Sequence, residues 1–158
     1  MRGPTLPMAV LLAMIVAALA PLAAQSSRLE GTWKVNLQKS KYSPGPPPKA
    51  QTLKWEAVPG GLRFTTDGVN AEGEATHTET LEKGDGSESP VEGSQTATTR
   101  ALKRINDRTY EDVDRNNGKI MISRRLAISR DGKTLTVTVK GVNVQGQMLN
   151  NVVVYEKQ

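Results

Sequence analysis

The chain has 158 residues, of which 37% are hydrophobic, 4% aromatic and 23% charged, and its formal net charge at pH 7 is +5. The absence of cysteine excludes disulfides and a lipid anchor on a cleavage-site thiol. Basic and acidic residues are intermixed, and the few aromatic residues do not interleave with Lys or Arg, so a base-stacking surface for nucleic acid is not expected.

The first 24 residues have the pattern of a cleavable signal peptide. Arg2 is the only early charge, an apolar run extends from Met8 to Leu19, and the chain becomes polar at Gln25. This run is shorter than the ~20 residues that a membrane-spanning helix needs. We therefore expect cleavage after Ala24, export to a periplasm or the exterior, and no stable membrane anchor.

Residues 25–158 are expected to form one all-β domain, because no helical period persists and short alternating runs are separated by turn residues. Loops this short join only antiparallel neighbours, which predicts a single antiparallel up-and-down β-barrel of roughly eight to ten strands. The ten candidate strands span residues 32–37, 51–58, 62–67, 75–82, 88–92, 96–105, 108–114, 119–129, 133–140 and 148–156.

The segment Ser43–Pro48 interrupts this pattern with four prolines. Proline lacks the amide hydrogen and fixes φ, so the segment cannot be a helix or a central strand. We interpret it as a rigid crossover that bridges one end of the barrel. The alternative is a polyproline docking site for a partner.

The pattern G-V-N-x-x-G occurs twice, at Gly68–Gly73 and at Gly141–Gly146. Asn and Gly are the residues that tight turns require. The repeat therefore predicts two similar hairpins in corresponding places, whether by duplication or by convergent turn chemistry.

Alternation places Ile120, Ile122, Leu126 and Ile128 on one face, and Arg124 falls on that same face. Burial of its charge is costly unless it is paired. Arg124 could bind a ligand's carboxylate or phosphate, pack over an interior ring such as Trp33 and donate to backbone carbonyls, or be turned out to solvent by a bulge. The predicted core contains Leu53, Trp55, Phe64, Leu81, Leu102, Ile122, Leu126, Leu135, Val137, Val152 and Val154.

Catalytic chemistry has little support in the sequence. His77, the only histidine, shares a strand face with Glu79, a pairing that is typical of a surface contact. A zinc or copper site would need carboxylates alone around it. The carboxylates Glu111, Asp112 and Asp114 lie on a strand that we expect to be solvated. We predict that the protein is not an enzyme and holds no cofactor and no metal.

The chain resembles the calycin superfamily, the lipocalins and fatty-acid-binding proteins, and most of all exported bacterial lipocalin-like proteins. Gly31-Thr32-Trp33 matches the lipocalin G-x-W motif, and the runs Lys39–Tyr42, Gly132–Thr138 and Val154–Lys157 extend the resemblance. It implies a barrel that Trp33 closes at one end. The R-x-Y pair that grips a carboxylate in fatty-acid-binding proteins is incomplete, since Val153 precedes Tyr155 at the Arg position, and the helical portal is replaced by the proline-rich stretch.

The resemblance implies a small-molecule binding protein for a lipophilic or anionic ligand. We expect a monomer that acts outside the cytoplasm and binds no nucleic acid. The candidate ligand-binding residues are Arg124, Tyr155, Trp33, Trp55 and Phe64. The alternative is a ligand-free structural or protein-interaction module of the cell envelope, whose barrel is filled by its own side chains. A cavity of at least ~300 Å³ that contains Arg124 would favour binding.

Overall fold

The computed structural model describes residues 27–158. The predicted signal peptide and its cleavage site lie outside these residues. Within the described part of the chain, no helix is long and apolar enough to cross a membrane.

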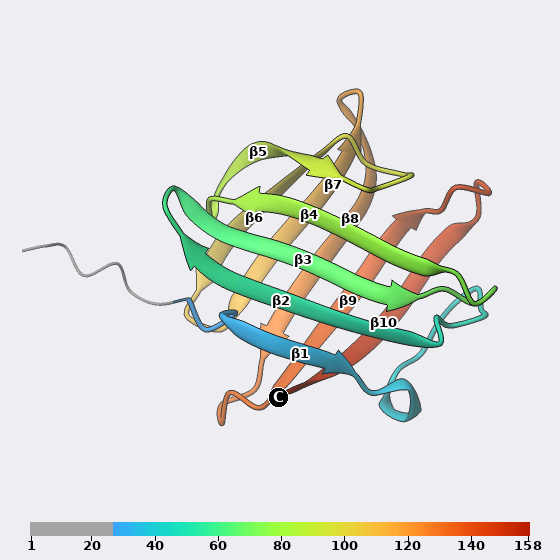
Figure 1. Cartoon of the computed structure of the whole chain (residues 1–158), viewed down its shortest axis with the longest axis horizontal. Helices are drawn as coiled ribbons and strands as arrows, with labels where there is room; N and C mark the ends of the chain where they lie inside the picture. Colours follow the sequence, from blue (N-terminus) through green and yellow to red (C-terminus); the bar gives the residue numbers. More distant parts are fainter. Residues whose placement is uncertain (1–26) are drawn as a thin grey trace, which may run out of the picture.

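The chain forms a closed antiparallel barrel in which each strand pairs with the next, and β1 closes the ring by pairing with both β2 and β10 (Figure 1). This confirms the predicted all-β, up-and-down barrel at the upper end of its strand count, and each predicted strand overlaps an observed one. The strands are β1 (Gly31–Val35), β2 (Ala50–Val58), β3 (Gly61–Val69), β4 (Ala75–Glu82), β5 (Asp85–Glu92), β6 (Thr99–Asn106), β7 (Thr109–Asn116), β8 (Lys119–Ile128), β9 (Thr134–Val142) and β10 (Met148–Lys157).

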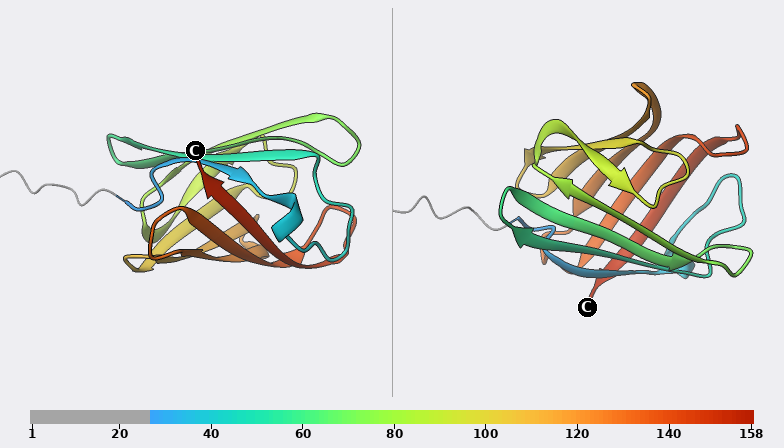
Figure 2. Two further views of the ribbon diagram at one scale, coloured as in Figure 1. Left: turned by 90° about the horizontal axis from the view of Figure 1, so that it is seen from below. Right: turned by 45° about the horizontal axis from the view of Figure 1, so that its top comes forward.

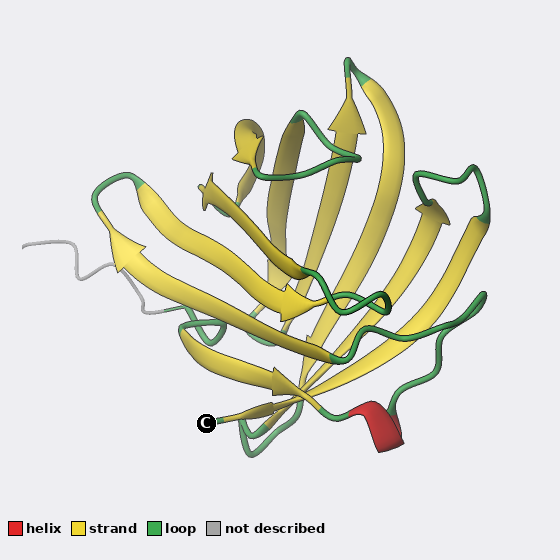
Figure 3. Cartoon of the chain, turned by 45° about the vertical axis from the view of Figure 1, so that its right-hand side comes forward, coloured by secondary structure: helices red, strands yellow, loops and turns green. Residues whose placement is uncertain are grey.

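The barrel has two different ends. The mouth carries the β3–β4 and β9–β10 turns and the crossover from β1 to β2, which begins with the 3-10 helix η1 (Leu37–Lys39) (Figure 3). The opposite end carries the chain's entry into β1 and its C-terminus. Strands β2 to β4 and β7 to β10 form opposing walls between these ends (Figure 2).

Trp33 is fully buried and belongs to the core near the C-terminal end of the barrel. Its indole Nε1 donates a hydrogen bond to the carbonyl oxygen of Leu29 at 2.7 Å, and Lys157 Nζ lies 5.0 Å from its ring centroid. Because Leu29 is also fully buried, this end of the barrel is closed by side chains.

The crossover packs along β10 rather than standing free. Lys41 forms a bridge with Val152, and Ser43 exchanges two hydrogen bonds with β10: its carbonyl accepts from Asn150 N at 2.8 Å, and its N–H donates to Asn151 Oδ1 at 2.8 Å. We call residues 40–49 the proline strap. The strap lies between β1 and β2, as predicted for the crossover. The alternative, a polyproline docking site, is not tested by the structure.

The predicted core is correct at eight positions and wrong at three. Leu81 and Val152 are 36% and 37% exposed, and Val154 is only half-buried. Their neighbours Glu82, Val153 and Tyr155 point inward instead. In β10 three consecutive valines give no alternation, and in β4 hydrophobicity alone favours Leu81 over Glu82. The positions where the prediction is correct are Leu53, Trp55, Phe64, Leu102, Ile122, Leu126, Leu135 and Val137.

A bulge in β8 explains a fourth difference from the prediction, at Ile120, which alternation placed on the same face as Ile122. Asp114 is opposite Ile122 but Arg115 is opposite Ile120, so Met121 is an extra residue and the inward phase changes there. Ile120 is consequently 56% exposed rather than part of the core. Gly141 of β9 accommodates the bulge, because with φ of +152° a Cβ there would collide with the Met121 carbonyl oxygen.

The two G-V-N-x-x-G segments form matching turns. Asn70 N donates to the Glu74 carbonyl at 2.9 Å and Asn143 N to the Gln147 carbonyl at 3.0 Å. Each asparagine Oδ1 also accepts from two backbone N–H groups of its own turn, and each Nδ2 donates to the side chain of Glu74 or Gln147. The predicted similarity of the two hairpins is confirmed.

We expect Asn70→Ala and Asn143→Ala each to lower the free energy of unfolding by ~1 kcal/mol, because each removes the side chain that holds several backbone groups of its turn. Chemical denaturation measures both. The exposed Gln145→Ala in the second turn is the control and should change stability by less than ~0.5 kcal/mol. A large effect from only one asparagine would show that the two turns are not energetically equivalent.

Candidate functional site

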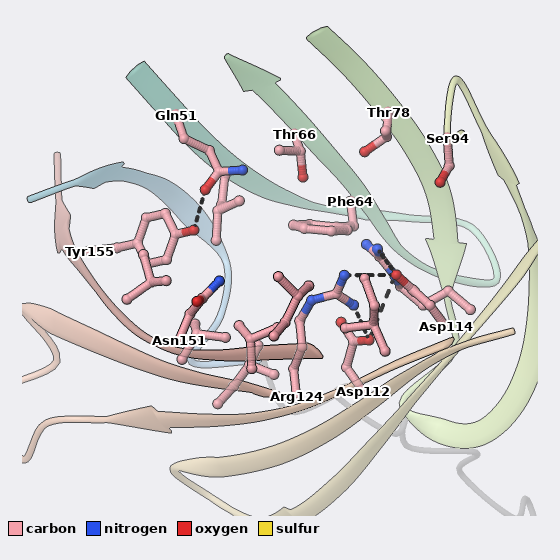
Figure 4. A pocket seen from close by; sticks show the side chains of 18 of the residues that line it. Gln51, Phe64, Thr66, Thr78, Ser94, Asp112, Asp114, Arg124, Asn151 and Tyr155 are labelled. Carbon is pink, nitrogen blue, oxygen red and sulfur yellow. Dashed lines mark hydrogen bonds and ion pairs between the residues drawn. The ribbon is translucent and has the colours of Figure 1, made fainter. Parts of the chain in front are cut away.

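A cavity of about 320 Å³ occupies the barrel interior (Figure 4). It extends toward the mouth, where Tyr42 and Pro48 of the proline strap border it. One part of its wall is apolar, a second part is charged, and a third part is polar and uncharged. The apolar part consists of Leu53, Trp55, Phe64, Ile122, Leu126, Val137, Val139, Leu149 and Val153.

Trp55 and Phe64 form the aromatic part of this wall. They are directly opposite each other on β2 and β3, and their rings stack with centroids 4.3 Å apart and an interplanar angle of 23°. Both side chains are buried. The stack gives the cavity one flat, rigid side.

A cluster of four charged residues forms the second part of the wall. Arg100 on β6, Asp112 and Asp114 on β7 and Arg124 on β8 all line the cavity, because the three strands are neighbours and their alternation is in phase. Figure 4 shows Asp112, Asp114 and Arg124. Arg124 Nη1 donates to Asp112 Oδ1 at 2.9 Å and Nη2 to Asp114 Oδ2 at 2.7 Å. Arg100 donates to both Asp114 oxygens, at 2.5 and 2.9 Å.

Asp114, only 1% exposed, is the centre of the charge cluster. Burial by itself raises the pKa of its carboxyl, but Arg124 and Arg100 outweigh burial, and the pKa lies well below its usual range. Asp114 therefore remains ionised at neutral pH. By formal charge, the two arginines of the cluster balance its two aspartates.

This arrangement corrects two expectations. Arg124 points into the barrel, but its two terminal nitrogens bind carboxylates of the protein, an outcome different from all three that alternation left open. Asp112 and Asp114 are buried rather than solvated; on that strand only Glu111, which pairs with Arg125 at the surface, fits the expectation.

Glu82 contacts Trp55 of the aromatic stack and is 2% exposed. Its Oε2 accepts a hydrogen bond from Trp55 Nε1 at 2.7 Å, while Oε1 has no hydrogen-bond partner among residues 27–158. Burial, with a further contribution from Asp112, raises the pKa of this carboxyl to about 8. Glu82 is therefore mostly protonated at pH 7 and leaves the balance of the charge cluster unchanged.

The third part of the wall is polar and uncharged. Tyr155 Oη donates to Gln51 Oε1 at 2.5 Å, and Tyr42 and Asn151 lie on the same side of the cavity. Burial raises the pKa of the Tyr155 hydroxyl, which therefore stays protonated. Tyr42 Oη is buried and has no hydrogen-bond partner among the described residues.

Four of the five candidate ligand-binding residues line the cavity: Arg124, Tyr155, Trp55 and Phe64. Trp33 does not line it and serves the closed end of the barrel instead. Contact of these residues with a ligand remains a prediction.

Sequence reasoning missed Arg100, Glu82, Gln51 and Tyr42, and it misplaced Asp112 and Asp114. One signal was available for the two aspartates. They stand at i+2 and i+4 from Tyr110 on one strand face, and an inward Tyr110 places both beside Arg124. Tyr110 is indeed buried.

His77 forms an exposed cross-strand contact on the outer face of the barrel. Its Nδ1 lies 2.6 Å from Oδ1 of Asp67, its partner on β3. Within residues 27–158, no group of three or more His, Cys, Asp or Glu side chains could hold a metal ion.

No protein-family model matches the chain, and no curated protein matches it. Among solved structures, it is similar to a zebrafish ileal bile acid-binding protein crystallised in complex with cholic acid. The identity is 12%, the match covers 84% of this chain and 100% of that chain, and the TM-score is 0.48.

Proposed function

We propose that this protein is a binding protein for a small lipophilic molecule, that it acts outside the cytoplasm, and that it performs no catalysis. The observation that carries the proposal is the interior cavity of about 320 Å³ behind the mouth. Its volume lies within the range of small-molecule sites, ~300–1,000 Å³. An apolar wall with a few fixed polar groups is the composition that such sites have.

A ligand-free module of the cell envelope is the second candidate. One observation favours it: the charge cluster occupies part of the barrel interior, and each of its four members binds another member. These groups need no ligand to satisfy them. The two candidates differ in whether the remaining cavity is filled in the cell.

Native mass spectrometry of the protein purified from its own host tests the proposal. We expect a co-purifying molecule of defined mass bound one to one. Val139→Trp fills the cavity from β9 and should abolish the adduct, whereas Lys140→Trp, on the exposed face of the same strand, should retain it. Circular dichroism verifies that both variants fold.

Two results would favour the ligand-free module instead. One is a bare protein mass from the host. The other is an adduct that survives Val139→Trp in a folded protein, because such an adduct lies outside the cavity. Val137→Phe, which also projects into the cavity, replaces Val139→Trp if that variant does not fold.

A further inference from the structure

We propose, building on the proposed function, that the cavity selects an uncharged lipophile and that Tyr42 donates a hydrogen bond to the ligand's acceptor oxygen. Esters, ketones and ethers have such an oxygen without a charge. A carboxylate ligand is disfavoured. The proposal depends on two independent features of the cavity: the internal balance of its charges and the position of an unused hydroxyl donor.

The charge balance argues against an anionic ligand. Arg100 and Arg124 are the cationic side chains that line the cavity, and both bind Asp112 or Asp114, which line it too. The formal charges of these two arginines and two aspartates sum to zero. An anion that entered would lose its hydration and meet two carboxylates as well as two guanidinium groups, so burial of its charge has no net compensation.

Competition for the arginines does not change this balance. A ligand carboxylate that took the place of Asp112 or Asp114 at Nη1 or Nη2 of Arg124 would have to displace that aspartate. The displaced aspartate is at most 3% exposed and would remain buried without its partner. Loss of one partner of a buried pair costs ~3–5 kcal/mol, which is more than one new ion pair returns.

The unused donor indicates where an uncharged polar group binds. Tyr42 Oη is buried beside the cavity without a hydrogen-bond partner in the described part of the chain. Ser40 Oγ lies near the Tyr42 hydroxyl but donates its own proton to the Asn36 carbonyl at 2.7 Å and accepts from Val154 N at 2.9 Å, so Ser40 does not donate to Tyr42. An unsatisfied buried hydroxyl costs ~1–3 kcal/mol, which a ligand acceptor would recover.

The surroundings of Tyr42 are also uncharged. Gln51, Asn151 and Tyr155 share this side of the cavity, and the Gln51 amide nitrogen faces the cavity centre (Figure 4). Burial raises the pKa of both the Tyr42 and Tyr155 hydroxyls, so both remain neutral donors. The apolar wall with the Trp55–Phe64 stack then receives the rest of the ligand.

The test compares two probes of equal chain length, methyl dodecanoate and dodecanoic acid, with the delipidated protein at pH 7.5. At this pH the acid is ionised in water. Isothermal titration calorimetry gives both dissociation constants. We expect the ester to bind at least about tenfold more tightly than the acid. Equal or tighter binding of the acid would overturn this inference and leave the proposed function intact.

Tyr42→Phe tests the donor. The variant should weaken binding of the ester by about threefold to tenfold, the range expected for one hydrogen bond. Tyr110→Phe is the matched control, because Tyr110 is buried outside the cavity lining and its Oη lies 3.1 Å from Ser27 Oγ. An unchanged ester affinity in Tyr42→Phe would overturn the assignment of the donor.

Asp112→Asn tests the charge balance. The amide oxygen can still accept from Arg124, while the cluster gains one net positive charge. The preference for the ester over the acid should fall by at least about tenfold. An unchanged preference would contradict the electrostatic argument. If the wild-type protein binds neither probe, the proposed function itself fails, and this inference fails with it.

Discussion

Asp114→Ala is expected to reduce the free energy of unfolding by ~3–5 kcal/mol, the largest effect of the substitutions considered. Asp114 accepts hydrogen bonds from both Arg100 and Arg124, at distances between 2.5 and 2.9 Å. Its removal leaves two guanidinium groups and one carboxylate in the barrel interior. Arg100 is 7% exposed, so its guanidinium group would remain buried without this partner.

Urea denaturation measures this loss, and Glu111→Ala on the same strand is the matched control. Glu111 also pairs with an arginine, Arg125, at 3.1 Å, but both side chains are about half exposed. A surface pair of this kind contributes no more than ~1 kcal/mol. A similar loss in the two variants would show that the buried cluster does not contribute more than a surface ion pair.

The fold was predictable because turn chemistry and hydrophobic alternation act locally. Asn-Gly and Asp-Gly pairs mark the β7–β8 and β8–β9 turns, and short turns leave antiparallel pairing as the only option. It was less predictable which residues of each strand point into the barrel. Val152, Val153 and Val154 are equally suited to either face, and the choice among them depends on Tyr155, which binds Gln51 on β2 inside the barrel.

The polar half of the site could not be derived in the same way, because hydrophobicity assigns charged residues to the surface. Asp114 and Glu82 are buried because of partners that are distant in the sequence: Asp114 pairs with Arg100, and Glu82 accepts from Trp55. Alternation did identify the anomaly at Arg124. It could not show that Asp112 and Asp114 also point into the barrel, since their direction depends on which face of β7 Tyr110 occupies.

Glu82→Gln is expected to remove a loss of stability that the wild-type protein shows as pH rises. The pKa of Glu82 is about 8 in the folded protein, against 4.5 as its ordinary value. The folded state therefore keeps a proton that the unfolded chain releases. The stabilisation linked to this proton is complete below pH ~4.5, declines as pH rises, and is lost above pH ~8.

The difference in free energy of unfolding between Glu82→Gln and wild type should rise in favour of the variant by at least ~2 kcal/mol from pH 5 to pH 9. Urea denaturation at several pH values gives this difference. Glu72→Gln, at an exposed position in the β3–β4 turn, is the control, and its stability should parallel that of wild type. Parallel curves for Glu82→Gln and wild type would contradict the assignment of a raised pKa to Glu82.

Trp55 provides an independent readout of the same ionisation, because its indole Nε1 binds Glu82 directly. Tryptophan fluorescence of the folded wild-type protein should change with a midpoint near pH 8, and Glu82→Gln should abolish the transition. Trp33 contributes a background without this transition, because its indole binds a backbone carbonyl at the closed end of the barrel. A fluorescence transition that persists in Glu82→Gln would assign the titration to a group other than Glu82.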